Sequence, residues 1–218
     1  MRIVCSNFKQ LNAFFSCTPN QKIVKRCISN PKPLTVVEGP AGSGKTMLTL
    51  EASMKLVDEE AYESLIVTRP MVGVIQEQIG YLPGSLEEKS APWTDVIHAY
   101  AYRPFTFIPL TFMRGHTWDN SIILADEMQN STPEQMKTLL TRVGRNTKLI
   151  INGDTSQSDI GTRNGLSDLR SRLTTGEGEY FDVVQLTSDD IKRSPFVKFI
   201  HELYEDENHM LESGVDLR

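Results

Sequence analysis

Short apolar runs of strand length recur along the chain, and stretches of helix-forming residues separate them. The runs are nearly continuous rather than alternating, which indicates parallel strands that helices bury on both faces. Alternating strands and helices predict an α/β fold with a mostly parallel sheet. The predicted strands are "LTVVE" (34–38), "SLIVT" (64–68), "SIILAD" (121–126), "KLIIN" (148–152) and "YFDVVQL" (180–186).

Local signals predict where the helices between these strands begin. The segment "KTMLTLEASMKLV" (45–57) is rich in helix formers, and "TPEQMKTLLTRV" (132–143) opens with a capping box. In that box Thr132 is the N-cap and Gln135 stands at the third helical position. Asn164 is a suitable cap for a further helix that follows it.

The pattern predicts one domain over residues 18–204. Residues 69–120 are less regular and hold many of the proline and aromatic residues, so they are interpreted as an insert between two core strands. Residues 1–17 are expected to form an N-terminal extension, and residues 205–218 a polar, frayed tail.

Composition excludes several classes of protein. Of 218 residues, 39% are hydrophobic and 23% are charged, which is typical of a folded, water-soluble chain. No apolar run is long enough to cross a membrane, and the first residues do not resemble a secretory signal. Three cysteines without a C-x-x-C spacing favour a reduced, cytoplasmic protein. The net charge of −5 argues against a surface that binds nucleic acid throughout, although a local basic groove remains compatible with it.

The segment "GPAGSGKT" (39–46) fits G-x-x-x-x-G-K-[ST] between a predicted strand and a predicted helix, as a phosphate-binding P-loop requires. Glycines let backbone N–H groups curl around an anion, and the helix N-terminus adds unpaired donors. The lysine can reach the β- and γ-phosphates, and the threonine hydroxyl can coordinate Mg²⁺. The predicted nucleotide-binding residues are Gly39, Pro40, Ala41, Gly42, Ser43, Gly44, Lys45 and Thr46, of which Lys45 is also catalytic and Thr46 also a metal ligand. The loop predicts a P-loop (RecA-like) fold that binds a nucleotide with Mg²⁺.

Two acidic residues end the strand "SIILAD". Asp126 is the second residue expected to hold Mg²⁺, through the water shell of the ion, as in other P-loop proteins. Glu127 would lie near the γ-phosphate, where a carboxylate can act as general base on an attacking water. A kinase would use a substrate hydroxyl instead and would not need the adjacent glutamate, so the pair favours hydrolysis.

The strand "KLIIN" also ends in polar residues, namely Gly153, Asp154 and, four positions beyond the glycine, Gln157. If this strand lies between the P-loop strand and the Asp-Glu strand, Gln157 comes beside the γ-phosphate. An amide there can orient water and report hydrolysis to a mobile surface. The alternative is an ordinary polar loop in which Asp154 forms an Asx turn.

Taken together, "GPAGSGKT", "ADEMQNSTPEQMKTLLTRVG" (125–144) and "INGDTSQSD" (151–159) resemble the PhoH-like ATPases, relatives of superfamily 1 helicases. The resemblance extends from about Thr18 to Tyr204. It implies that Gln21 reads the adenine edge and that Arg193 contacts the γ-phosphate, either in its own subunit or in a neighbouring one. Three further arginines lie in family-like segments without an assigned role: Arg69, Arg114 and Arg142.

The resemblance also implies a function: ATP hydrolysis coupled to binding or unwinding of RNA or a single strand, by a homo-oligomer such as a hexamer. The alternative is a nucleotide-gated assembly or regulatory ATPase that unwinds nothing. Local support for nucleic acid comes from aromatic side chains in the insert and from basic residues near the N-terminus. The aromatic residues are Tyr81, Trp93, Tyr100 and Tyr102, and the basic ones are Lys22, Lys25, Arg26 and Lys32.

Overall fold

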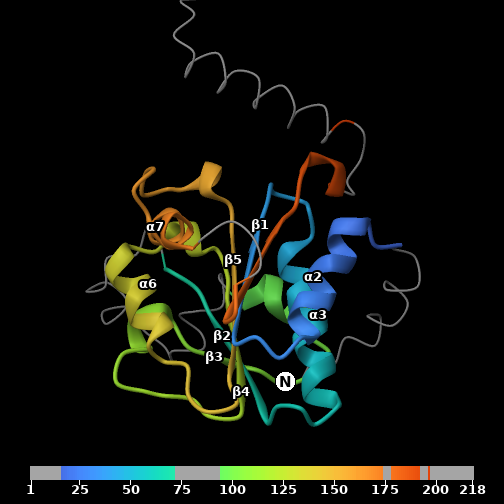
Figure 1. Ribbon diagram of the computed structural model, residues 1–218, viewed down its shortest axis with the longest axis vertical. Helices are drawn as coiled ribbons and strands as arrows, with labels where there is room; N and C mark the ends of the chain where they lie inside the picture. Colours follow the sequence, from blue (N-terminus) through green and yellow to red (C-terminus); the bar gives the residue numbers. More distant parts are fainter. Residues whose placement is uncertain (1–15, 72–93, 174–177, 192–195, 197–218) are drawn as a thin grey trace, which may run out of the picture.

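The computed structural model describes residues 16–71, 94–173, 178–191 and 196. Within these ranges six strands form one sheet in the order β3-β2-β4-β5-β1-β6, and every neighbouring pair is parallel. The carboxyl ends of the strands point upward in Figure 1. The strands are β1 (Leu34–Glu38), β2 (Ser64–Thr68), β3 (Thr106–Phe107), β4 (Ser121–Ala125), β5 (Lys148–Gly153) and β6 (Phe181–Gln185).

The predicted α/β fold with a parallel sheet is confirmed, and all five predicted strands form within one residue at either end. One strand was not predicted. Thr106–Phe107 lies in the segment interpreted as an irregular insert, yet it forms the two-residue strand β3 and pairs with β2 at the edge of the sheet. Part of that segment therefore belongs to the sheet itself.

Helices cover both faces of the sheet (Figure 1). Helices α2 (Pro19–Ser29) and α3 (Lys45–Asp58) lie on one face, and α6 (Pro133–Leu140) and α7 (Gly165–Arg172) on the other. Strand β4 shows how the core divides, because Ile122 and Leu124 contact the α2–α3 cluster whereas Ile123 contacts the α6–α7 cluster. Both faces are buried, which explains the continuous apolar runs. In the described ranges no helix is both long and apolar enough to cross a membrane.

Side chains cap the N-termini of three of these helices. The predicted capping box at Thr132 and Gln135 forms, and Asn164 accepts a hydrogen bond from the N–H of Ser167 at 2.9 Å. Helix α3, all of which the structure describes, differs from these three. Its N-cap residue is Gly44, and no side chain caps its N-terminus. Gly44 has φ +84°, a left-handed conformation that glycine adopts without a Cβ clash. The first N–H groups of α3 therefore lack a side-chain partner and suit an anion.

Strand β5 lies between β1 and β4, which was the arrangement required for the polar ends of these strands to meet. In this register Glu38 is paired with Gly153, and Ala125 with Ile151. Ligand sites of open α/β sheets lie outside the carboxyl ends of the strands. The order of the strands therefore brings the P-loop, Asp126 and Asp154 together at the carboxyl ends of the central strands.

The glycine at the end of β5 has a steric reason. A Cβ at Gly153 would lie 2.5 Å from Leu166 Cδ2 of α7 and 2.8 Å from Gln129 Oε1. Gln129 belongs to the short 3₁₀ helix η2 (Met128–Asn130), which follows the Asp-Glu pair. The absence of a side chain lets helix α7 and Gln129 both approach the backbone of β5.

Lys148 is the first residue of β5, at the amino ends of the strands, and it is fully buried. Its ammonium donates hydrogen bonds to the carbonyl oxygens of Cys27 at 3.0 Å, Asn30 at 2.8 Å and Lys32 at 2.9 Å. These contacts connect β5 to the end of α2 and to the loop that leads into β1. Burial lowers the pKa of Lys148 to about 8.

Replacing Lys148 by Met should lower the free energy of unfolding by about 2–4 kcal/mol near pH 7, because three buried carbonyls lose their donor. The loss should grow at higher pH. The lysine of the unfolded chain keeps its proton up to its ordinary pKa of 10.5, whereas the folded value is about 8. Between these values the unfolded state binds more protons, so wild-type stability rises with pH and the variant lacks this gain. Urea unfolding at two pH values, with the exposed Lys137→Met as control, measures the effect. A difference that does not change with pH would contradict it.

Replacing Gly153 by Ala should lower the free energy of unfolding by about 1–3 kcal/mol, because the new methyl group overlaps Leu166 and Gln129. The matched control is Thr155→Ala at an exposed position of the same loop. Thermal unfolding of both variants tests this, and an unchanged midpoint for Gly153→Ala would show that the close approach is not required.

Candidate functional site

The P-loop lysine lies folded over its own loop. Lys45 Nζ donates hydrogen bonds to the carbonyl oxygens of Gly39 and, at 3.0 Å, of Pro40. Burial lowers the pKa of Lys45, whereas the carboxylates of Asp154, Glu127 and Asp126 act in the opposite direction. The ammonium, at the N-terminus of α3, is therefore within electrostatic range of three acidic groups.

Asp126 is buried at the carboxyl edge, with 2% of its side chain exposed. Its Oδ1 accepts hydrogen bonds from Thr46 Oγ1 at 2.9 Å and from Asn152 Nδ2 at 3.2 Å. Its Oδ2 is buried and has no hydrogen-bond partner, and Arg69 Nε lies 3.5 Å away. Burial raises the pKa of Asp126, and the charge of Arg69 is the strongest opposing influence.

The oxygens around Asp126 fit a magnesium ion. Mg²⁺ prefers hard oxygen ligands and is usually bound by one or two carboxylates together with substrate phosphates. Thr46 and Asp126 supply a hydroxyl and a carboxylate in contact with each other, and Oδ2 of the carboxylate still lacks a donor. In the described part of the chain, no group of three or more His, Cys, Asp or Glu side chains could hold a metal. A magnesium ion here would therefore depend on phosphate oxygens for further ligands.

Glu127 adopts a strained backbone conformation, with φ +56° and ψ +38°. A non-glycine residue in this region costs about 1–3 kcal/mol and often marks a functional position. The turn leaves the carboxylate 41% exposed, with Oε1 3.3 Å from Arg69 Nη2. Oε2 accepts a hydrogen bond from Gln129 Nε2 at 2.7 Å. Two donors thus hold the carboxylate at the mouth of the site.

Gln129 also joins the loop after β4 to the loop after β5. Its Oε1 accepts a hydrogen bond from the N–H of Asp154 at 3.1 Å, and its carbonyl oxygen accepts one from Ser158 Oγ at 2.9 Å. Asp154 forms an Asx-type contact to the N–H of Ser156 at 3.0 Å, which was the alternative interpretation of this loop. The contact does not exclude a role at the site, because Asp154 also lies near Lys45.

Gln157 lies in the 3₁₀ helix η3 (Thr155–Gln157) and is exposed. Its backbone N–H donates to the carbonyl of Asp154 at 3.1 Å. It therefore stands at the same edge as Asp126 and Glu127, on the loop that Gln129 anchors, and its side chain faces solvent. Its role at the γ-phosphate stays a prediction. Arg193 lies outside the described residues.

The side-chain amide of Gln21 forms hydrogen bonds within the protein, one of them to the P-loop. Its Nε2 donates hydrogen bonds to the carbonyl oxygens of Ser43 at 3.0 Å and Asp190 at 3.1 Å, and its Oε1 accepts one from the N–H of Thr18 at 3.1 Å. Both N–H donors of the amide are thus used inside the protein, and the residue is 5% exposed. In this arrangement Gln21 fixes the P-loop, and reading an adenine would require the amide to exchange partners.

Sequence reasoning missed several residues of the site. Arg69 was noted without a role, although its position directly after β2 placed it at the carboxyl edge. Asn152 could have been found from the sequence, because it is a polar residue in a buried strand. In the structure its amide donates hydrogen bonds to both Asp126 and Thr49. The ion pair between Arg170 of α7 and Glu38 of β1 had no local signal. Burial raises the pKa of Glu38, and Arg170 opposes this.

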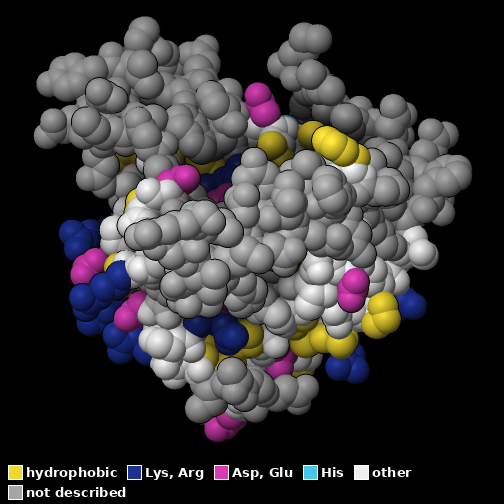
Figure 2. All heavy atoms as spheres, turned by 90° about the horizontal axis from the view of Figure 1, so that it is seen from above, with side chains coloured by type: hydrophobic (Ala, Val, Ile, Leu, Met, Phe, Trp, Pro, Cys, Tyr) yellow, Lys and Arg dark blue, Asp and Glu magenta, His cyan; other side chains and the backbone are white. Residues whose placement is uncertain are grey.

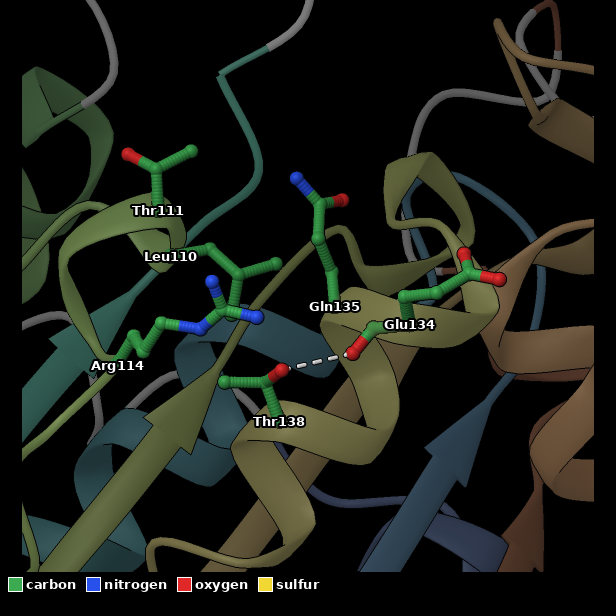
Figure 3. Close-up of a pocket in the computed structure, with 6 residues that line it drawn as sticks. All are labelled: Leu110, Thr111, Arg114, Glu134, Gln135 and Thr138. Carbon is green, nitrogen blue, oxygen red and sulfur yellow. Dashed lines mark hydrogen bonds between the residues drawn. The ribbon is translucent and has the colours of Figure 1, made fainter.

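A hollow of about 170 Å³ lies between α6 and the 3₁₀ helix η1 (Leu110–Phe112). Figure 3 shows the guanidinium of Arg114 and the amide of Gln135 on opposite sides of it. The backbone N–H of Leu110 donates to the carbonyl oxygen of Arg69 at 3.2 Å, so the wall of the hollow is tied to the carboxylate site. The lining residues are Leu110, Thr111, Arg114, Glu134, Gln135 and Thr138.

Part of the predicted basic and aromatic surface makes contacts within the protein, whereas Lys22 and Arg26 are exposed. Lys25 pairs with Glu51 at 2.9 Å, and Lys32 with Asp182 at 2.6 Å. Tyr100 packs against the core. Seen from the carboxyl edge, basic and acidic side chains lie interspersed along one side of the molecule (Figure 2). Tyr81 and Trp93 lie outside the described residues.

Comparisons with known proteins agree with this fold. The large terminase of a thermophilic bacteriophage has a similar fold, with a TM-score of 0.52 over 86% of this chain and 50% of its own, at 13% sequence identity. The PhoH-like protein of Bacillus subtilis is 36% identical over 186 residues, which cover 78% of this chain and 57% of that protein. Protein PhoH of Escherichia coli K12 is 34% identical over 181 residues, covering 75% and 50%. The chain thus spans about half the length of these curated relatives. The family model described as PhoH-like protein matches residues 15–205. The chain therefore belongs to the PhoH-like protein family.

Proposed function

We propose that the chain binds ATP with Mg²⁺ and hydrolyses it, using residues 18–204 as one ATPase domain. The observation that carries this proposal is the contact at 2.9 Å between Thr46 of the P-loop and Asp126, directly after β4, with Lys45 and Glu127 beside it. A phosphate-binding loop, a pair of metal-binding oxygens and a further carboxylate are the parts that hydrolysis of a nucleoside triphosphate requires.

Each of these residues has a role in the proposed reaction. The backbone N–H groups of residues 39–46 and the N-terminus of α3 bind the phosphates, and Lys45 turns from its loop carbonyls to the β- and γ-phosphates. Thr46 and Asp126 hold Mg²⁺, which neutralises charge on the phosphate oxygens when it is bound. Glu127 accepts a proton from the attacking water.

Three residues act around this centre. Gln157 orients the water or reports the state of the γ-phosphate to the exposed loop that carries it. Arg193 spreads charge over the transferring group, in its own subunit or in a neighbouring one. Gln21 contributes to the adenine end of the site through its hold on the P-loop.

We further propose that hydrolysis is coupled to binding or unwinding of RNA or a single strand, by a homo-oligomer such as a hexamer. The support is the resemblance of the motifs to those of superfamily 1 helicases. The hollow beside α6 adds local support, because it presents a guanidinium, hydroxyls and an amide and is tied to Arg69. Such groups suit a phosphate backbone and base edges.

The second candidate function is a nucleotide-gated assembly or regulatory ATPase that does not unwind nucleic acid. It is favoured by the net charge of −5 and by the pairing of Lys25 and Lys32 with acidic residues. Both observations reduce the positive field that a nucleic-acid strand would meet.

Replacing Glu127 by Gln should lower ATP turnover at least about 100-fold while ATP binding persists, because the amide keeps the shape of the side chain but cannot accept the proton. Lys45→Ala should lose ATP binding as well. Phosphate release and equilibrium binding of a labelled ATP analogue separate the two effects, with the exposed Glu179→Gln as control. Turnover that survives in Glu127→Gln would show that another group is the base.

Adding single-stranded RNA or DNA should raise the ATPase rate, and the effect should weaken steeply between low and physiological salt, since phosphate contacts release counterions. Rates measured across a salt series test this for the motor function. No stimulation at any salt, with ATP binding intact, would favour the regulatory alternative. Native mass measurement with an ATP analogue reports whether a ring forms in either case.

A further inference from the structure

One guanidinium lies between the two acidic residues of the site. Arg69, directly after β2, has its Nε 3.5 Å from Asp126 Oδ2 and its Nη2 3.3 Å from Glu127 Oε1. The arginine side chain is 14% exposed and that of Asp126 2%, so their contact is shielded from water, whereas the contact with Glu127, which is 41% exposed, is partly open to water. Arg69 therefore touches the proposed metal ligand and the proposed base at the same time.

Asp126 depends on Arg69 for a positively charged partner. The donors to its Oδ1, from Thr46 and Asn152, are both neutral, and its Oδ2 has no hydrogen-bond partner. The nearest acidic neighbour, Glu127, has the same sign and makes the charge of Asp126 less favourable. A buried carboxylate requires an opposite charge, because burial removes its stabilisation by water. Arg69 provides the largest such influence on Asp126.

We propose that Arg69 is a positioning residue that serves as counter-ion of the Asp126–Glu127 pair in the nucleotide-free chain and withdraws from Asp126 when that carboxylate holds Mg²⁺. This inference rests on the proposed function. The physical reason is that two cations beside one buried carboxylate repel each other. Arg69 then keeps only its contact with Glu127.

The consequence concerns the base. In this structure Glu127 is held by Arg69 on Oε1 and by Gln129 on Oε2, so its carboxylate is contacted from two sides. Because the same guanidinium also contacts Asp126, binding of a metal at Asp126 changes the contact between Arg69 and Glu127. Arg69 thereby links metal loading to the placement of Glu127.

The first arm of the test uses the nucleotide-free protein. Arg69→Gln should lower the midpoint of thermal unfolding by at least about 4 °C, because Asp126 loses its counter-ion. In the Asp126→Asn background the same change should have less than half of that effect, since the charge that needs a partner is gone. Arg145→Gln, an exposed arginine that pairs with Asp119, is the control and should leave the midpoint unchanged. Additive effects of the two substitutions would overturn the inference.

The second arm measures how nucleotide binding depends on Mg²⁺. With a non-hydrolysable ATP analogue, Arg69→Gln should need at least about five-fold less Mg²⁺ for half-maximal binding, because the competing cation is gone. Its kcat should fall about ten-fold without a higher KM for ATP, and Arg69→Lys should restore both values towards wild type. An unchanged Mg²⁺ requirement in the variant would overturn the exchange. If the wild-type chain binds no nucleotide, the proposed function fails and the exchange fails with it, whereas a wild type that binds and hydrolyses ATP isolates the failure to Arg69.

Discussion

The buried charge of Asp126 is the constraint on which the organisation of the site depends. A carboxylate that is 2% exposed must be met by donors from the protein, and each donor here comes from a different element. Thr46 belongs to α3, Asn152 to β5 and Arg69 to the segment after β2. Four elements that lie far apart in the sequence are therefore held together at one carboxylate, and the order of the strands makes this possible.

The loops beyond the strands follow from the same arrangement. The left-handed turn at Glu127 directs the chain from β4 into η2, and this places Gln129 against the loop after β5. Gly153 leaves room for that approach. The strain at Glu127 is offset by the contacts that the turn creates, because Gln129 then holds both the carboxylate of Glu127 and the N–H of Asp154. The loop after β4 and the loop after β5 thus form one connected unit rather than two independent turns.

Much of this could be predicted from the sequence, because the signals are local. Five strands, the caps at Thr132 and Asn164, and the P-loop each follow from neighbouring residues. What could not be predicted depends on distance in space. Strand β3 has only two residues and carries no pattern of its own, and it forms because β2 offers a free edge. The partners of Arg69 and Gln21 lie on other elements, so their side-chain contacts appear only once the sheet is assembled.

The position of β3 has a consequence for how such a chain can change over time. The three adjacent strands at the centre of the sheet, β4, β5 and β1, have no freedom of register, because a shift of one residue would turn Asp126 or Asn152 to the wrong face. The connection from β2 to β4 instead runs by way of the outermost strand, where residues can be added or lost without altering that register. New partners can therefore be acquired along this connection while the chemistry at the centre stays as it is. Because its first residue is Arg69, each such variation begins next to the side chain that contacts both carboxylates.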